Sequence, residues 1–335
     1  MISEEKRLAF LENLRIKTSV PLCCCMHPDC SDVPIYSHVY QREGVLREIS
    51  TEGTVMMFTY ETLFSLLRNE SPIGYKRTGL RKAFAFYGFC ESHDHSIFAP
   101  IEPADRNVNW YSQYNLYLLG YRNICREYYI QLQTKQILQE YMNSHVISGE
   151  QRIMAGYKIT CCNRGIESIK KYKTLFENSI NSKDFTKYYF RVLMLPFRLD
   201  LCLASPITIS EECRLYLGPD KDRITDTINI IDIFPHKDRT AVIIGFLEGA
   251  ENNWAKEIYQ MLSNGDPEEL CLAMQDILFR SEFHCMSELL YEQIKNDVPL
   301  FLEEWKMLNS NYSHQLQYTS NIFKKIIMKE LGYTN

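Results

Sequence analysis

The chain has 335 residues, of which 45% are hydrophobic and 24% are charged, and it carries a formal net charge of -5 with a pI near 6.0. This length predicts about two domains, and the composition excludes a disordered or fibrous protein. A uniformly basic surface is excluded as well, so any nucleic-acid contact needs a local cluster of Lys and Arg. No apolar run of about 18 residues and no leader pattern is found, so we expect a cytoplasmic protein without a membrane segment.

The first elements along the chain are a short helix and a cysteine-rich stretch. Leu8, Leu11 and Leu14 recur at helical spacing behind Ser3, which predicts an amphipathic packing helix over residues 3–16. The 12 cysteines are expected to be reduced thiols, some of them bound to a metal. We expect the cysteines beyond residue 100 to be small buried hydrophobic residues: Cys125, Cys161, Cys162, Cys202, Cys213, Cys271 and Cys285.

Two short-spaced pairs of ligands predict a metal site. Cys25 and Cys30 are separated by four residues in an irregular segment, and Cys90 and His93 are separated by two residues further along. Thiolate and imidazole are the ligands that Zn²⁺ prefers, and two such pairs are the usual basis of a small metal-stapled unit. We therefore predict a structural zinc site formed by Cys25, Cys30, Cys90 and His93. The neighbours Cys23 and Cys24 are alternatives to Cys25.

The segments between and after these pairs predict two strands, a basic stretch and a helix. Alternation predicts strands over residues 35–40 and 53–58, with a helical turn over 46–50 between them. Residues 61–82 are the most basic stretch near the metal site, so Arg77, Arg81 and Lys82 are candidate nucleic-acid contacts, with a solvated loop as an equal alternative. An aromatic strand over residues 83–89 leads to a helix over 90–98, which ends at a proline-rich run.

The remainder predicts an α+β protein with a helical region and a small antiparallel sheet. Tyrosine and leucine spacings predict helices over residues 110–145 and 151–182, and helices return over 253–331. Four β-branched or alternating runs predict strands over residues 197–205, 207–209, 227–234 and 240–246, with a hairpin loop at 235–239. We expect a zinc-binding domain over residues 1–105 and a helical domain over 106–335, whose inserted sheet covers about 196–247 and which serves recognition or regulation.

The order of the motifs resembles that of the HNH, or ββα-metal, nuclease superfamily in its zinc-stapled treble-clef form. The resemblance is carried by the Cys-x4-Cys pair, by Ser37-His38 on the first strand, and by Cys90-x2-His93-Asp94 at a helix start. The chain also resembles a group of uncharacterised bacterial proteins that share the pattern of residues 34–41 and that of residues 89–102. The HNH resemblance covers under a quarter of the chain.

The resemblance implies a catalytic set beside the zinc site. His38 matches the family's general base, and Asp94 matches the helix residue that helps to hold a catalytic Mg²⁺ or Mn²⁺. His95 is a candidate further ligand or phosphate contact. Ser37 departs from the acidic or histidine residue that often precedes the base, and the family's middle Asn has no clear match, because Asn69 is the only Asn in the connection.

Two functions therefore stay open. The first is a metal-dependent endonuclease that acts on DNA or RNA, in a setting such as phage defence. The second is a catalytically inactive zinc-stabilised scaffold that binds a nucleic acid or a protein partner, and a homo-oligomer is compatible with both. In the second case His38 is a buried structural histidine, Asp94 caps the helix, and Glu102 is a supporting carboxylate in either case.

Overall fold

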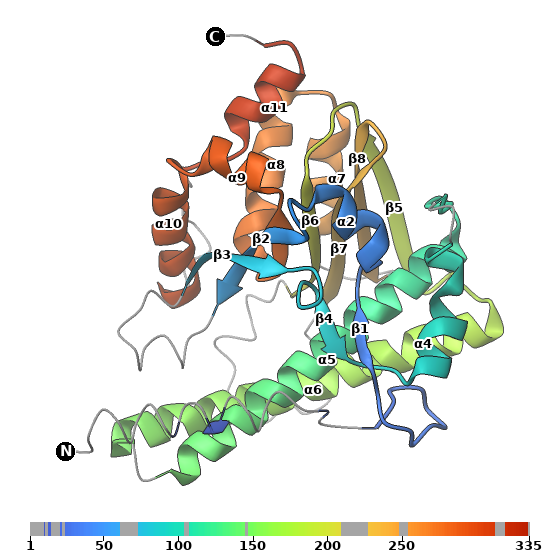
Figure 1. Cartoon of the computed structure of the whole chain (residues 1–335), viewed down its shortest axis with the longest axis vertical. Coiled ribbons are helices and arrows are strands. Elements are labelled where there is room, and N and C mark those ends of the chain that lie inside the picture. Colours follow the sequence, from blue (N-terminus) through green and yellow to red (C-terminus); the bar gives the residue numbers. More distant parts are fainter. Residues whose placement is uncertain are drawn as a thin grey trace. The chain divides into compact units, whose positions relative to one another are not determined.

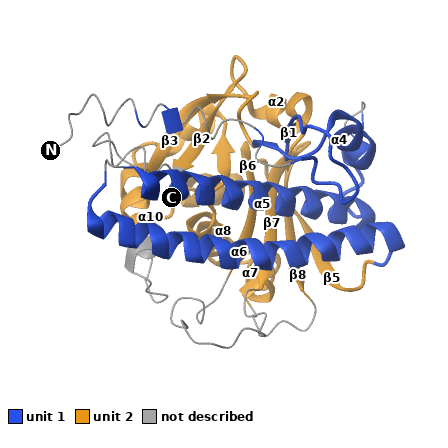
Figure 2. Ribbon diagram, turned by 90° about the horizontal axis from the view of Figure 1, so that it is seen from below, with its two compact units in different colours: residues 1–39, 62–70, 85–184 blue, residues 40–61, 71–84, 185–335 orange. Residues whose placement is uncertain are grey.

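The computed structural model describes residues 10, 13–14, 21, 24–60, 73–103, 107–144, 147–208, 227–247, 254–311 and 319–333 (Figure 1). Most of the predicted N-terminal helix lies outside the described residues, as do Cys23, Asn69 and Cys213. The chain is an α+β protein and forms two compact units (Figure 2). Unit 1 comprises residues 1–39, 62–70 and 85–184, and unit 2 comprises residues 40–61, 71–84 and 185–335. The predicted boundary between a zinc-binding domain (residues 1–105) and a helical domain (residues 106–335) stays a prediction.

Unit 1 begins its described fold with a cysteine-rich loop and two short strands. The strand β1 (Tyr36–His38) pairs in antiparallel register with β4 (Ala85–Tyr87), although residues 39–84 separate them in the chain. The helix α4 (Glu91–Phe98) and the 3-10 turn η2 (Ala99–Ile101) follow β4. The predicted strands and helix at these places are therefore present, and β1 is shorter than the alternation of residues 35–40 suggests.

Two long helices make up the rest of unit 1. They are α5 (Gln113–Asn143) and α6 (Gly149–Ser182), which pack along each other as a hairpin (Figure 2). The first half of α5 is buried on nearly all sides, which explains its high content of leucine and tyrosine. At the start of α6, Ser148 and Gln151 form a capping box that fixes where the helix begins. Both predicted helices are present.

Unit 2 contains a seven-stranded sheet whose neighbouring strands are all antiparallel, in the order β3-β2-β9-β6-β7-β8-β5. Its strands are β2 (Thr54–Tyr60), β3 (Ile73–Gly79), β5 (Tyr188–Leu195), β6 (Leu201–Thr208), β7 (Ile228–His236), β8 (Arg239–Leu247) and β9 (His284–Met286). The sheet is larger than predicted because β2, β3, β5 and β9 join the expected strands. The sequence of β3 contains glycine, lysine and arginine, so it is atypical of a strand, and β9 is only three residues long.

Helices pack on one face of this sheet. They are α7 (Trp254–Ser263), α8 (Pro267–Arg280), α9 (Glu288–Ile294), α10 (Val298–Asn311) and α11 (Lys324–Glu330). Alternate residues of β7 and β8, among them Ile231, Ile233 and Val242, form one buried core with Met274 and Phe301 from these helices. Between β1 and β2 the chain forms the π-helical turn η1 (Arg42–Leu46) and α2 (Arg47–Ile49), where a helical turn was predicted.

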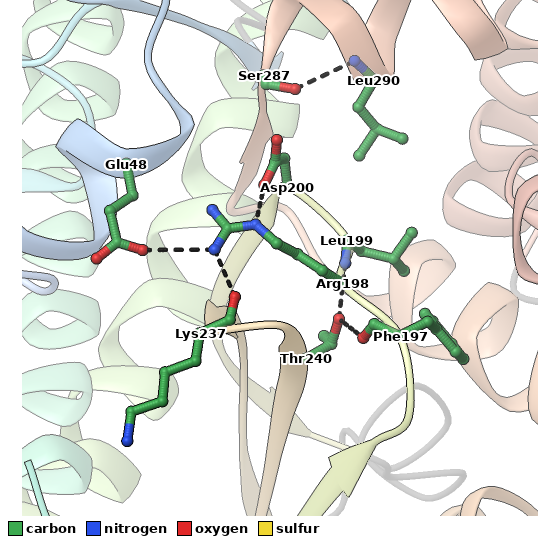
Figure 3. A network of polar contacts seen from close by, with 9 residues as sticks. All are labelled: Glu48, Phe197, Arg198, Leu199, Asp200, Lys237, Thr240, Ser287 and Leu290. Atoms are coloured by element: carbon green, nitrogen blue, oxygen red, sulfur yellow. Dashed lines mark hydrogen bonds and ion pairs between the residues drawn. The ribbon is translucent and has the colours of Figure 1, made fainter. Parts of the chain in front are cut away.

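A polar network fixes the connection between β5 and β6 (Figure 3). Arg198 donates from Nε to Asp200 at 2.8 Å and from Nη1 to the carbonyl oxygen of Lys237 at 2.7 Å, and it lies 3.6 Å from Glu48. The hydroxyl of Thr240 accepts a hydrogen bond from the N–H of Leu199 and donates one to the carbonyl oxygen of Phe197, on either side of Arg198. These contacts link the β5–β6 connection to the β7–β8 hairpin and to α2, all within unit 2.

Candidate metal centre

The ligand atoms of Cys25, Cys30, Cys90 and His93 converge, all lying within 4.8 Å of one another. The Sγ atoms of Cys30 and Cys90 are 3.9 Å apart, and Nδ1 of His93 lies 3.6 Å from Sγ of Cys25 and 3.2 Å from Sγ of Cys90. Ligand bonds of about 2.3 Å to sulfur and about 2.0 Å to nitrogen place two tetrahedral sulfurs about 3.8 Å apart, and a sulfur and a nitrogen about 3.5 Å apart. The four predicted side chains therefore form a cluster that can bind a metal ion such as zinc.

Backbone hydrogen bonds shape the loop that carries the first two ligands. The N–H of Cys25 donates to the carbonyl oxygen of Asp32 at 2.8 Å, and the N–H of Cys30 donates to that of His27 at 3.2 Å. The first bond closes the loop, and the second makes the tight turn that brings Cys30 back towards Cys25. The N–H of Met26, next to Cys25, donates to the carbonyl oxygen of Gly88 at 2.8 Å. This bond holds the loop against the backbone just before Cys90.

The other two ligands stand at the start of α4. Cys90 is the N-cap residue of this helix, with an extended ψ of 164°, and His93 lies in the first turn. A helix start places residues three apart on one side, so the thiol and the imidazole face the same point. The approach to Cys90 is close-packed, because a Cβ added at Gly88 would lie 2.4 Å from the ring of Phe86. Only glycine fits there without displacing that ring.

Without a bound cation, the close approach of three cysteine sulfurs disfavours their ionisation to thiolates. Cys25, Cys30 and Cys90 carry free thiols. A hydrogen bond from the backbone of Asp32 lowers the pKa of Cys30, but burial and the Cys25 and Cys90 thiols raise it to about 12. A bound metal ion reverses this balance, since it deprotonates the thiols that coordinate it.

A second imidazole, which the sequence reasoning did not include, packs against the ligand histidine. The ring of His27 stacks on that of His93 with centroids 4.0 Å apart and an interplanar angle of 5°. Burial lowers the pKa of His27, and the neighbouring His93 lowers it further, so the His27 ring is neutral at pH 7. The stack restricts the rotation of His93 and adds no charge beside the cluster. A histidine inside a Cys-x4-Cys loop is the signal that could have found it.

Arg122 is a further residue of this region that was not predicted from the sequence. Its guanidinium comes from α5, is 1% exposed, and contacts Glu102 at 2.5 Å and Asp94 at 3.3 Å. It also lies 4.0 Å from the centroid of the Phe98 ring. Two carboxylates and an aromatic face therefore surround one buried cation. Since Cys90 is the N-cap of α4, the alternative in which Asp94 caps that helix is wrong.

The remaining candidates of unit 1 occupy different environments. His38 is partly buried on β1, opposite Ala85, and its ring centroid lies 6.3 Å from that of Tyr36. Ser37 is buried beside it. His95 is exposed, and because it is two residues from His93 on the helix, the two rings point in different directions. His95 is thus poorly placed to share the ion that His93 can bind.

The predicted nucleic-acid contacts belong to unit 2. Arg77, on β3, forms a two-point ion pair with Glu288, with Nε to Oε1 and Nη2 to Oε2 both at 2.7 Å. This pair neutralises much of the charge that Arg77 would offer to a phosphate. Arg81 and Lys82 are exposed in the turn that follows β3. Their role in nucleic-acid binding stays a prediction.

Comparison of the chain with protein family models, with curated proteins and with solved structures gives no match. The likeness to HNH nucleases therefore depends on the motifs and their order alone. Within the described residues, no helix combines the length and the apolar character needed to cross a bilayer.

Proposed function

We propose that Cys25, Cys30, Cys90 and His93 bind one structural Zn²⁺ ion and that this ion staples a treble-clef-like unit. The convergence of three thiols and one imidazole nitrogen, whose ligand atoms all lie within 4.8 Å of one another, carries the proposal. Because all four positions are filled by protein ligands, no position is left for a reactive water. That arrangement is typical of structural zinc and not of catalytic zinc.

For the unit as a whole, we propose an HNH-type endonuclease that hydrolyses phosphodiester bonds in DNA or RNA. The observation that supports this best is the spatial order of a cysteine loop, a strand with His38, its partner strand β4, and a helix whose start supplies Cys90 and His93. His38 would accept the proton of the attacking water. Asp94 would hold a Mg²⁺ or Mn²⁺ ion, which when bound stabilises the charge that develops on the phosphate.

Arg122 is compatible with that role of Asp94. Its Nη2 contacts Oδ1, while a carboxylate offers about four lone-pair sites over two oxygens. The carboxylate can therefore coordinate an ion while Arg122 fixes its orientation, as supporting residues commonly do around metal ligands.

The same ion pair also favours a second candidate, a zinc-stabilised scaffold without catalysis. A buried arginine that neutralises Asp94 weakens the attraction of that carboxylate for a divalent cation. In this case Asp94, Glu102 and Arg122 simply fasten α4 and η2 to α5. The unit then binds a nucleic acid or a protein partner and leaves it uncut.

Cleavage of plasmid DNA and of single-stranded RNA in Mg²⁺ or Mn²⁺ separates the two. The nuclease proposal predicts that His38→Ala lowers the rate by at least about 100-fold, as expected for a general base. His236→Ala, which alters a histidine of unit 2, is the matched control. Equal cleavage by wild type and His38→Ala, or none by either, rejects the nuclease. Binding without cleavage by the wild type supports the scaffold.

Metal analysis tests the zinc centre by itself. We expect about one zinc ion per purified chain and its loss in Cys30→Ser and in Cys90→Ser. Zinc content that is unchanged in both variants would place the metal elsewhere.

A further inference from the structure

The helix α6 carries positive charge in a chain that is acidic overall. Together α5 and α6 contain nine Lys or Arg and five Asp or Glu residues, a net charge of +4, whereas the whole chain has -5. Between Arg152 and Lys173 there are six basic residues and a single acidic one, Glu167. The basic charge is therefore concentrated on this helix.

Three of these six cations are exposed and make no ion pair within the described part of the chain: Lys158, Arg164 and Lys171. The other three are engaged, Arg152 with the carbonyl oxygens of Met142 and Ser144, Lys170 with Glu167, and Lys173 with Glu177. The three exposed cations thus keep their charge available for a partner.

Their spacing fits an extended polyanion. Arg164 and Lys171 are seven residues apart, so they lie on nearly the same side of α6 and about 10 Å apart along its axis. Lys158 lies about 9 Å before Arg164 along the axis and about 120° away round the helix, so it extends the basic surface to a neighbouring side of α6. Cations at these intervals reach separate phosphates and do not converge on one small anion.

We propose that the exposed cations Lys158, Arg164 and Lys171 of α6 bind the phosphate backbone of a nucleic acid. The proposal rests on the proposed function for the class of partner, but it holds whether or not the unit cuts. An anionic membrane fits less well, since a membrane-bound helix needs apolar residues along its length. On α6 the large exposed apolar side chains are Ile153, Met154 and Tyr157, all near its beginning.

The test measures binding of a fluorescently labelled DNA duplex and a labelled single-stranded RNA to the full zinc-loaded chain, without Mg²⁺ or Mn²⁺. The variant is the triple charge reversal Lys158→Glu, Arg164→Glu, Lys171→Glu. The control in unit 2 is Lys256→Glu, at an exposed lysine. A separate variant, Arg81→Glu with Lys82→Glu, tests the competing contacts that the sequence predicts in unit 2. We expect the triple variant to raise Kd at least tenfold for the preferred probe and to reduce the salt slope by about two to three.

Several results would overturn the assignment. Among them are wild-type affinity in a triple variant with an unchanged circular dichroism melt, no binding by the wild type at low salt, and loss of binding in the Arg81 and Lys82 pair alone. Binding of phosphatidylserine vesicles in place of both probes would do so as well. Failure of the nuclease proposal gives a different pattern, in which α6-dependent binding persists and no phosphodiester bond is cut.

Discussion

Replacing Arg122 with methionine removes a buried positive charge while keeping an unbranched apolar side chain over the Phe98 ring. The guanidinium is 1% exposed, and its two partners, Asp94 and Glu102, are 17% and 24% exposed. The substitution therefore leaves the carboxylates of Asp94 and Glu102 without the cation that neutralises both of them.

The expected cost follows from this burial. Removing one partner of a buried ion pair costs about 3–5 kcal/mol. Because both carboxylates keep some contact with water, part of this penalty is relieved, and we expect about 3 kcal/mol for Arg122→Met. A variant that also carries Asp94→Asn and Glu102→Gln removes the stranded charges. It should return to within about 1 kcal/mol of the wild type, since well-packed neutral replacements of buried ion pairs are often tolerated.

Urea unfolding of zinc-loaded protein at pH 7, followed by far-UV circular dichroism, measures both values. Arg122→Lys is a useful companion, because it keeps the charge and loses the planar fork that contacts two carboxylates. The reasoning is refuted if Arg122→Met loses under about 1 kcal/mol, or if the triple variant is as unstable as the single one.

Three further predictions concern other groups. Chelation or Cys30→Ser should lower Tm together with zinc content. Cys161→Ser should change neither, because the Cys161 thiol is exposed and not buried as the sequence led us to expect. Burial lowers the pKa of His284 to about 3, so the free energy of unfolding should fall by up to about 1.4 kcal/mol per pH unit below pH 6.5, and His284→Gln should flatten that slope in pH-dependent urea melts. Although burial raises the pKa of Glu304, hydrogen bonds from Ser320 and Thr319 lower it overall. Its stabilisation is thus present above its unfolded pKa and lost as the pH falls through its lower folded pKa, so Glu304→Gln should be less sensitive to acid than the wild type.

The ligand set could be predicted from the sequence because each half of it is local. Cys25 and Cys30 share one loop, and Cys90 and His93 share one helix start, so chain spacing alone restricts their geometry. The long helices α5 and α6 were predictable for the same reason, since their apolar periodicity extends over many turns.

Features that depend on distant pairing could not be predicted in this way. Arg122 lies in an apolar helix, and its role is visible only once Asp94 and Glu102 approach it from another part of the chain. The strand β3 has a polar, glycine-containing sequence, and it forms because β2 pairs with it over seven positions. Tertiary pairing overrides local propensity here.

The strands β1 and β4 pair with each other although a long segment of the chain, residues 39–84, separates them. Residues 36–38 pair with residues 85–87, and most of the residues between them belong to unit 2. In a treble-clef hairpin the two strands are joined by a short loop, which is the place where the HNH resemblance leads us to expect the middle Asn. Because residues 39–84 take the place of this short loop, the motif has no equivalent position for that Asn. Under the proposed nuclease function, the residue that orients His38 is therefore expected among side chains from elsewhere in unit 1 and not only in the connection between the two strands.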